Sequence, residues 1–283
     1  MKTMNYFKVI KAKLLLLGVL VISTTFNSCE QFDLDEDPTE ALLAVVPYTN
    51  IQELELAVTG IYGQLNKAAW MTTFYVNGWA GDDITTHRAS NKADFREYDQ
   101  RSVFPSNGRS LQNWQGVYSM VLAANTVLAN LEGVQLQDAE MQSQLTGETY
   151  FLRGLMFYHL ARIHGRIPLP LGLDVDPEIT RGTQVEVYEQ IESDMLQAES
   201  FLPVSSNLGA TRPNQGSARA MLARLYLDWA GFPVKDNSKY ADAAASAKEV
   251  IDRAGDFGFA LVDDMATLYT IAGRKNTESI FRV

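Results

Sequence analysis

Histidine is the first residue type in this sequence that could do chemistry. The chain has three histidines, and His159 and His164 are five positions apart, which does not give the i, i+4 pair of a helical zinc site. His159 falls on the apolar side of its expected helix, which favours a structural role over metal ligation. We therefore expect no metal site.

Two pairs of adjacent acids, Asp82-Asp83 and Asp263-Asp264, could supply the two carboxylates of a secreted glycoside hydrolase. Side chains of adjacent loop residues usually point apart, which disfavours this reading. The sequence also has no Gly-x-Ser-x-Gly nucleophile elbow, no phosphate-binding glycine loop and no second cysteine. We expect no catalytic residue and no cofactor, and we interpret the chain as a binding protein rather than an enzyme.

A segment rich in aromatic, Asp, Asn and Gly residues extends from Ala68 to Arg109 without a sustained helical stripe. Loops of this length in a compact domain are usually either functional or disordered, and the aromatic content of this one favours a long ordered loop. Aromatic rings with hydrogen-bonding groups beside them are typical of a ligand-binding surface. The segment offers both, and its candidate ligand-binding residues are Trp79, His87, Arg88, Asn91, Phe95 and Tyr98. In the alternative interpretation, the aromatic rings only bury the loop against neighbouring helices.

The first residues of the chain indicate export. Lysines at positions 2, 8, 11 and 13 precede an apolar run from Leu14 to Ile22, and small or polar residues then lead to Cys29. These nine apolar residues would span ~14 Å as a helix, which is short of the ~30 Å hydrocarbon layer. Residues 1–28 are therefore interpreted as a cleaved signal peptide.

Cys29 is the only cysteine, so an internal disulfide is excluded. Its position after the apolar run is that of the lipidated cysteine of a bacterial lipoprotein, and several acyl chains would anchor the chain stably. The alternative is a chance cysteine in an ordinary signal peptide, because Phe26 is unusual at its place. We assign residues 29–50 to a lipidated tether.

The charge of the mature chain argues against one class of partner. Removal of residues 1–28 takes away four lysines and no acid, which changes the formal net charge from −10 to −14. An acidic surface of this kind repels phosphate backbones, so nucleic acid is not an expected partner.

Helical periodicity dominates most of the remaining chain. Apolar residues at three-and-four spacing predict helices over residues 51–67, from 110 onward, and over 139–164, 185–202, 216–230 and 239–254. Helices joined by short turns pack as antiparallel hairpins, as in tetratricopeptide arrays, although no clean repeat of about 34 residues is present. Residues 257–262 and 279–283 are interpreted as short strands. The expected fold is mostly α, with tetratricopeptide-like hairpins, one long irregular aromatic loop and short strands.

Five stretches follow one another along the chain: Trp114-x-x-x-Tyr118 to Asn125, Glu148 to Arg153 continuing to Pro168, Val187-Tyr188 to Leu202-Pro203, Gly216 to Leu227, and Glu278 to Phe281. In this order they resemble motifs of the SusD/RagB family of outer-membrane nutrient-binding lipoproteins. The resemblance implies a helical domain over residues 51–283 that sits on a TonB-dependent outer-membrane transporter at the cell surface and presents glycans to it. Most motif residues are then scaffold, and we expect Trp114, Arg153 and Arg162 to fix helix contacts.

The resemblance also leaves alternatives open. The same architecture could capture peptides or another nutrient, and the sequence does not separate these ligands. An intracellular tetratricopeptide adaptor would use similar helices but has no use for residues 1–29. The chain ends at about the point where family members continue into an irregular C-terminal half, so we expect a domain that is truncated at its C-terminus.

Overall fold

The computed structural model describes residues 48–65, 81–82, 85–87, 89, 91–131, 138–174 and 176–282. The expected signal peptide, most of the tether with Cys29, and two candidate ligand residues, Trp79 and Arg88, lie outside these ranges. The described helices are α3 (Ile51–Leu65), α5 (Ala93–Asp99), α6 (Gly108–Ala129), α7 (Ala139–His164), α8 (Gln184–Phe201), α9 (Gln215–Ala230), α10 (Lys239–Asp252) and α11 (Ala254–Phe257).

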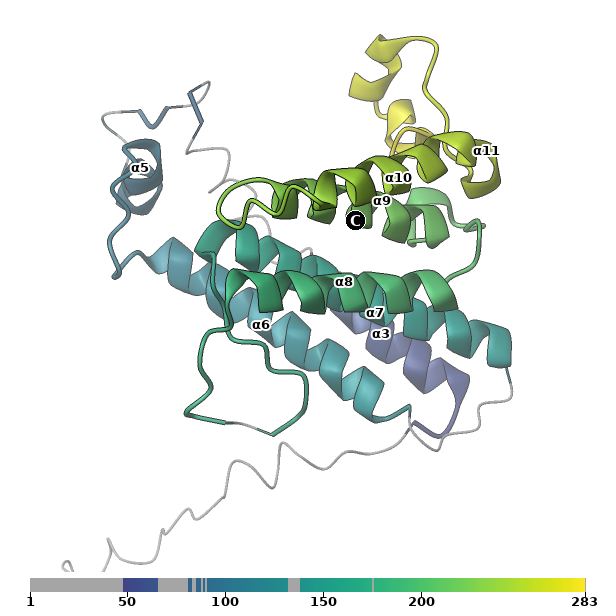
Figure 1. The fold of residues 1–283 in the computed structure, drawn as a ribbon, viewed down its shortest axis with the longest axis horizontal. Coiled ribbons are helices and arrows are strands. Elements are labelled where there is room, and N and C mark those ends of the chain that lie inside the picture. Colours follow the sequence, from purple (N-terminus) through teal and green to yellow (C-terminus); the bar gives the residue numbers. More distant parts are fainter. Residues whose placement is uncertain are drawn as a thin grey trace, which may run out of the picture. The chain divides into compact units, whose positions relative to one another are not determined.

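Consecutive long helices pack against each other, as the hairpin prediction requires. α6 packs on α7, α7 on α8, α8 on α9 and α9 on α10, while α3 packs on both α6 and α7 (Figure 1). The core lies where these helices meet and is centred on α7. The mostly α, tetratricopeptide-like fold is confirmed. No helix in the described ranges is both long and apolar enough to cross a membrane.

Local sequence signals set most helix ends. Thr183 and Glu186 form a capping box at the start of α8, and Asp138 caps α7 through the Met141 N–H. The structure corrects one expected boundary. α6 begins at Gly108 rather than at Ser110, because the Asn107 side chain caps the helix by accepting hydrogen bonds from the Arg109 and Ser110 N–H groups.

Two glycines allow α7 to approach its neighbours closely. A Cβ at Gly154 would lie 2.9 Å from the terminal methyl of Met195 and 3.0 Å from the Cβ of Asp194 on α8. A Cβ at Gly147 would lie 2.9 Å from the backbone nitrogen of Leu202. Any side chain at these positions would push α8 away from α7.

Buried polar groups tie the helices together. The guanidinium of Arg153 on α7 donates to both carboxylate oxygens of Asp194 on α8, at 3.0 and 2.6 Å, and to Asn125 on α6 at 2.9 Å. The Asn125 amide in turn donates to the carbonyls of Pro170 and Gly172. The prediction that Arg153 fixes helix contacts is confirmed.

A second buried cluster joins α3, α7 and the segment before α9. Glu148 of α7 is fully buried, accepts from the Tyr62 hydroxyl at 3.0 Å, and forms an ion pair of 2.5 Å with Arg212. The Arg212 guanidinium also lies 4.3 Å from the centre of the Tyr62 ring. The pair therefore holds three separate segments of the chain at one point.

The packing role expected for Trp114 is also confirmed, while Arg162 makes a weaker contact. The Trp114 ring is half-buried against the core and meets the His164 ring edge-on at 5.0 Å. Arg162 reaches α9, but its Nε lies 3.8 Å from Asp228 and its side chain is 47% exposed.

The expected short strands are wrong within the described residues. Phe257 ends α11, and Gly258 then adopts a left-handed conformation with φ 79°, which turns the chain. The following segment makes one backbone bond to the later stretch, from Ala260 N–H to the Thr277 carbonyl at 3.1 Å, and no ladder. The interval instead contains two 3-10 turns, η2 (Met265–Tyr269) and η3 (Ala272–Lys275).

The expected aromatic loop also needs correction, because it contains the helix α5. This helix has only seven residues, which is too few for a helix to be stable alone, and the sequence has no apolar stripe that predicts it. Hydrogen bonds between Thr86 and Asp99 and between Asn107 and Glu97 hold it in place.

His159 gives the fold an acid-sensitive point. Burial, followed by the charges of His164 and Arg162, lowers the pKa of His159 to about 4. In the unfolded chain a histidine takes up its proton near pH ~6.5, so between these two values the unfolded state binds more protons. The contribution of neutral His159 to the free energy of unfolding is therefore fully present above pH ~6.5 and is lost as the pH falls toward about 4.

We therefore expect the melting temperature of His159→Gln to fall less than that of the wild type when the pH is lowered from about 7 to about 5. This pH range lies around the ordinary histidine pKa. Thermal melts across that range measure the difference. If the melting temperature of His159→Gln fell as much as that of the wild type, His159 would not be the source of the acid sensitivity. His164→Gln is measured for comparison, because burial lowers the pKa of His164 as well.

Candidate functional site

The segment around α5 is fixed by side-chain hydrogen bonds at both ends. Asp99 accepts from the Thr86 N–H at 3.0 Å and from the hydroxyls of Thr86 and Thr85 at 2.7 and 3.1 Å. These bonds, above all that from the Thr86 backbone, hold the pKa of Asp99 below its usual value. The Asn107 amide donates to Glu97 at 2.7 Å and to the Asp94 carbonyl at 3.0 Å. The segment is therefore anchored to the start of α6.

The four described candidate residues lie in or just before α5. His87 and Asn91 are exposed, and the His87 Nδ1 accepts from the Ala89 N–H at 3.2 Å. Phe95 and Tyr98 are half-buried on α5 itself. The structure thus brings His87, Asn91, Phe95 and Tyr98 into one anchored segment.

The two aromatic rings of α5 face the first turn of α6. The guanidinium of Arg109 lies 4.9 Å from the centre of the Phe95 ring. Burial raises the pKa of Tyr98. Both rings therefore pack the segment onto α6 and leave only part of each ring for a ligand.

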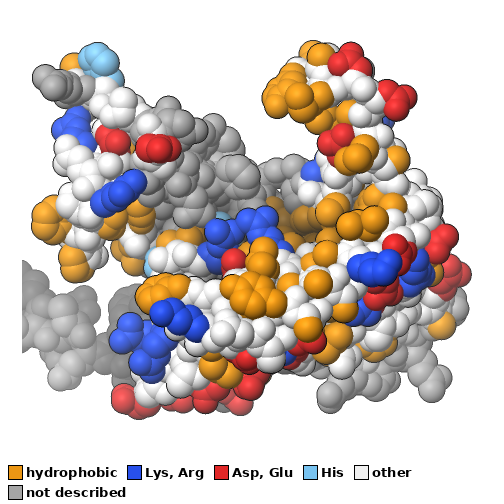
Figure 2. All heavy atoms as spheres, turned by 45° about the horizontal axis from the view of Figure 1, so that its top comes forward, with side chains coloured by type: hydrophobic (Ala, Val, Ile, Leu, Met, Phe, Trp, Pro, Cys, Tyr) orange, Lys and Arg blue, Asp and Glu red, His pale blue; other side chains and the backbone are white. Residues whose placement is uncertain are grey.

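Sequence reasoning missed the exposed apolar residues that border this packing. Phe104, between α5 and α6, is 60% exposed, and Leu111 on α6 is 56% exposed. Only their exposure, which follows from the tertiary structure, distinguishes them from core residues. In Figure 2 the part of the chain around α5 shows apolar, acidic and basic side chains together on the visible face.

A hollow lies along the first half of α6, next to this segment. Its volume is ≈ 370 Å³, and it is lined by Gly108, Leu111, Gln112, Gln115, Gly116 and Ser119. The two amides and the hydroxyl are neutral hydrogen-bonding groups, and Leu111 adds an exposed apolar contact. Neutral donors and acceptors beside apolar surface suit a ligand that carries many hydroxyls. The hollow and the α5 segment together form the α5–α6 site.

The described residues contain no group of three His, Cys, Asp or Glu side chains that could hold a metal ion. Of the acid pairs considered for catalysis, Asp83 lies outside the described residues, and Asp264 caps η2 by accepting from the Ala266 N–H at 2.9 Å. That carboxylate has a structural role.

Stacked helical hairpins are an architecture that many proteins use to bind ligands on an extended surface. Residues 34–227 match the SusD-like family described as starch-binding and associating with the outer membrane. The chain belongs to this family.

Known relatives agree with this assignment. The chain is 26% identical to SusD-like protein P2 of Formosa agariphila over 88% of this chain and 48% of the relative. It is 25% identical to a SusD-like protein of Bacteroides ovatus over 93% of this chain and 48% of that protein. The chain therefore spans about half the length of these curated relatives.

Solved structures show the same fold. A SusD homolog from Bacteroides thetaiotaomicron superposes with a TM-score of 0.69 at 25% identity, covering 78% of this chain and 43% of that one. A laminarin-binding SusD-like protein gives a TM-score of 0.69 at 25% identity, covering 83% of this chain and 51% of that one.

Proposed function

We propose that this protein is a cell-surface lipoprotein that captures oligosaccharides and presents them to a TonB-dependent outer-membrane transporter. The observation that carries the proposal is the family match over residues 34–227, which includes α3, the α5–α6 site and most of α9. The laminarin-binding relative supports a glycan as the ligand class. The chemistry of the α5–α6 site supports it independently, because amide and hydroxyl groups bind sugar hydroxyls without a charge.

The ligand is tested by an array of glycans and peptides probed with the full-length mature protein. Binding confined to glycans supports the proposal, whereas binding confined to peptides would favour the alternative of peptide capture by the same architecture. The transporter partner is tested by co-purification from outer membranes with a tag on this protein.

The site within the protein is tested by titration of the glycan selected by the array. We expect Gln112→Ala/Gln115→Ala to weaken binding about tenfold, because each lost hydrogen bond costs about 0.5–1.5 kcal/mol. Gln197→Ala, at an exposed position on α8, is the matched control and should bind as the wild type does. Unchanged affinity in the double variant would show that the glycan does not bind at α6.

The anchor is a separate prediction. Cys29 follows the apolar run of the expected signal peptide and has no cysteine to pair with. Metabolic labelling with a fatty-acid probe should mark the wild type and leave Cys29→Ser unlabelled and released from the membrane. Equal labelling of both proteins would show that Cys29 is not the lipid attachment point.

A further inference from the structure

Two arginines gather around one tyrosine between α7 and α9. The Nε of Arg224 donates to the Tyr158 hydroxyl oxygen at 2.9 Å, and that hydroxyl donates to Asp228 at 2.6 Å. The Nε of Arg162 lies 3.8 Å from the same Asp228 oxygen. Both guanidinium carbons lie close to the Tyr158 ring, at 5.8 Å for Arg162 and 5.9 Å for Arg224.

This cluster carries more positive than negative charge. Asp228 is the one described carboxylate within ion-pair distance of either arginine, and it already accepts a short hydrogen bond from Tyr158. Arg219, by comparison, pairs with both Glu199 and Glu249. This local excess of positive charge is opposite in sign to the formal net charge of the chain, which is −10.

The two guanidinium groups are accessible and partly preorganised. Arg224 is exposed, and the Arg162 side chain is 47% exposed. Because the bond to Tyr158 uses only the Nε of Arg224, the two terminal nitrogens of its planar fork remain for a ligand. Figure 2 shows basic side chains gathered near the middle of the visible face, beside exposed apolar ones.

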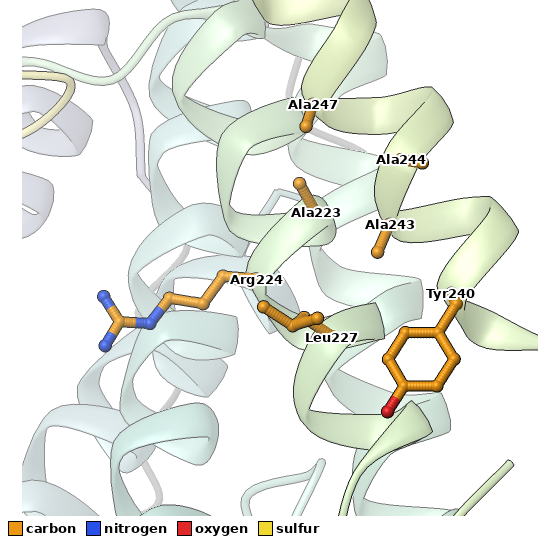
Figure 3. A pocket seen from close by; sticks show the side chains of 7 residues that line it. All are labelled: Ala223, Arg224, Leu227, Tyr240, Ala243, Ala244 and Ala247. Carbon is orange, nitrogen blue, oxygen red and sulfur yellow. The ribbon is translucent and has the colours of Figure 1, made fainter. Parts of the chain in front are cut away.

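The neighbouring hollow between α9 and α10 is not itself the charged site. Its volume is ≈ 410 Å³, and it is lined by Ala223, Arg224, Leu227, Tyr240, Ala243, Ala244 and Ala247. Figure 3 shows that the stem of Arg224 borders this hollow while its guanidinium group points away from it. The charge is therefore directed toward Tyr158, with apolar surface on the other side of the stem.

We propose that Arg162 and Arg224 form a binding site for an anionic group, a carboxylate or a sulfate, on the captured glycan. The inference rests on the proposed function and narrows its ligand class to acidic oligosaccharides. A guanidinium fork binds two oxygens of a carboxylate or sulfate in parallel, which a neutral sugar cannot offer. Because the formal net charge of the chain is −10, a local pair of arginines gives an anionic ligand a favourable place to bind on it.

The test compares matched ligands on the full-length mature protein. The carboxylate arm uses an oligogalacturonate and its methyl ester, and the sulfate arm uses a sulfated galactan oligosaccharide and its desulfated form. Calorimetric titration is performed with the wild type, with Arg162→Gln/Arg224→Gln, and with Arg253→Gln. Arg253, which pairs with Glu249 and Asp256 on the surface, is the matched control for the loss of a positive charge.

We expect the wild type to bind at least one acidic ligand at least tenfold more tightly than its neutral form. The double variant should lose this preference, while Arg253→Gln should keep it. The arm that shows the preference identifies the anion as carboxylate or sulfate. Equal binding of acidic and neutral forms by the wild type overturns the inference but leaves glycan capture intact. A preference that survives in the double variant also overturns it, and failure to bind any glycan contradicts the proposed function itself.

Discussion

Replacing Arg153 with alanine is expected to destabilise the fold by about 3–5 kcal/mol, because the substitution leaves a buried carboxylate without its partner. Asp194 is only 1% exposed, and Arg153 supplies two of its hydrogen bonds. The Gln190 amide, at 3.0 Å, would remain as a neutral donor to that charge. The substitution also removes the bond to Asn125, which orders the carbonyls after Pro168.

Denaturant unfolding of the full-length mature protein measures this effect. Arg253→Ala is the control, because exposed ion pairs of its kind contribute about 0–1 kcal/mol. Arg153→Ala/Asp194→Ala should be less destabilised than the sum of the single variants, since no lone charge is then buried. A single variant Arg153→Ala as stable as the control would show that the pair does not hold α7 to α8.

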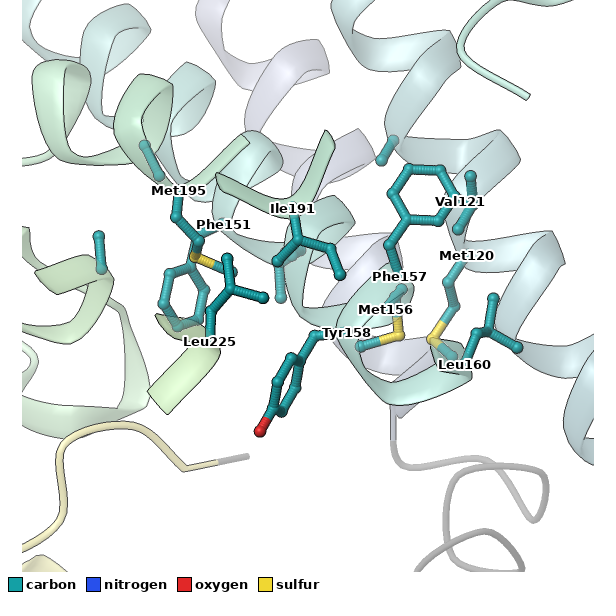
Figure 4. Packing of buried hydrophobic residues seen from close by; sticks show 14 of the residues in the cluster. Met120, Val121, Phe151, Met156, Phe157, Tyr158, Leu160, Ile191, Met195 and Leu225 are labelled. Carbon is teal, nitrogen blue, oxygen red and sulfur yellow. The ribbon is translucent and has the colours of Figure 1, made fainter. Parts of the chain in front are cut away.

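Truncation of Phe151 is the second substitution with a large expected effect. Its side chain is fully buried on α7 and meets the Phe281 ring edge-on at 5.0 Å. Figure 4 shows the ring in the core cluster that includes Met195 of α8 and Leu225 of α9. Because the ring is fully buried in a cluster that several helices build, the surroundings cannot close all of the space that its removal leaves, and Phe151→Ala should cost about 3–5 kcal/mol.

Phe232→Ala provides the same chemical change at a position that is 83% exposed, and it should leave the free energy of unfolding nearly unchanged. Phe151→Leu should fall between the two, since it removes less volume. Melting temperatures that rank the exposed position as the more sensitive one would contradict the placement of the core around α7.

The sequence by itself determined the long helices and the family. Helix positions follow from apolar spacing and from end signals that act within a few residues, such as the capping box of Thr183 and Glu186 and the stop at Gly165. α7 accordingly has the predicted bounds, Ala139–His164. The ordered motifs indicated the family because their residues, such as Arg153, are those that the scaffold buries.

Only the tertiary structure decided which distant side chains meet. Asp194 is the partner of Arg153 because Gly154 lets α8 approach α7. The two residues are 41 positions apart, and no local sequence pattern predicts that they meet. The helix α5 is held by hydrogen bonds with Thr86 and Asn107, which lie outside it, rather than by an apolar pattern of its own. The hollow on α6 and the arginine pair around Tyr158 also arise from helix packing, because the distances between side chains on different helices are not encoded in the spacing along any one of them.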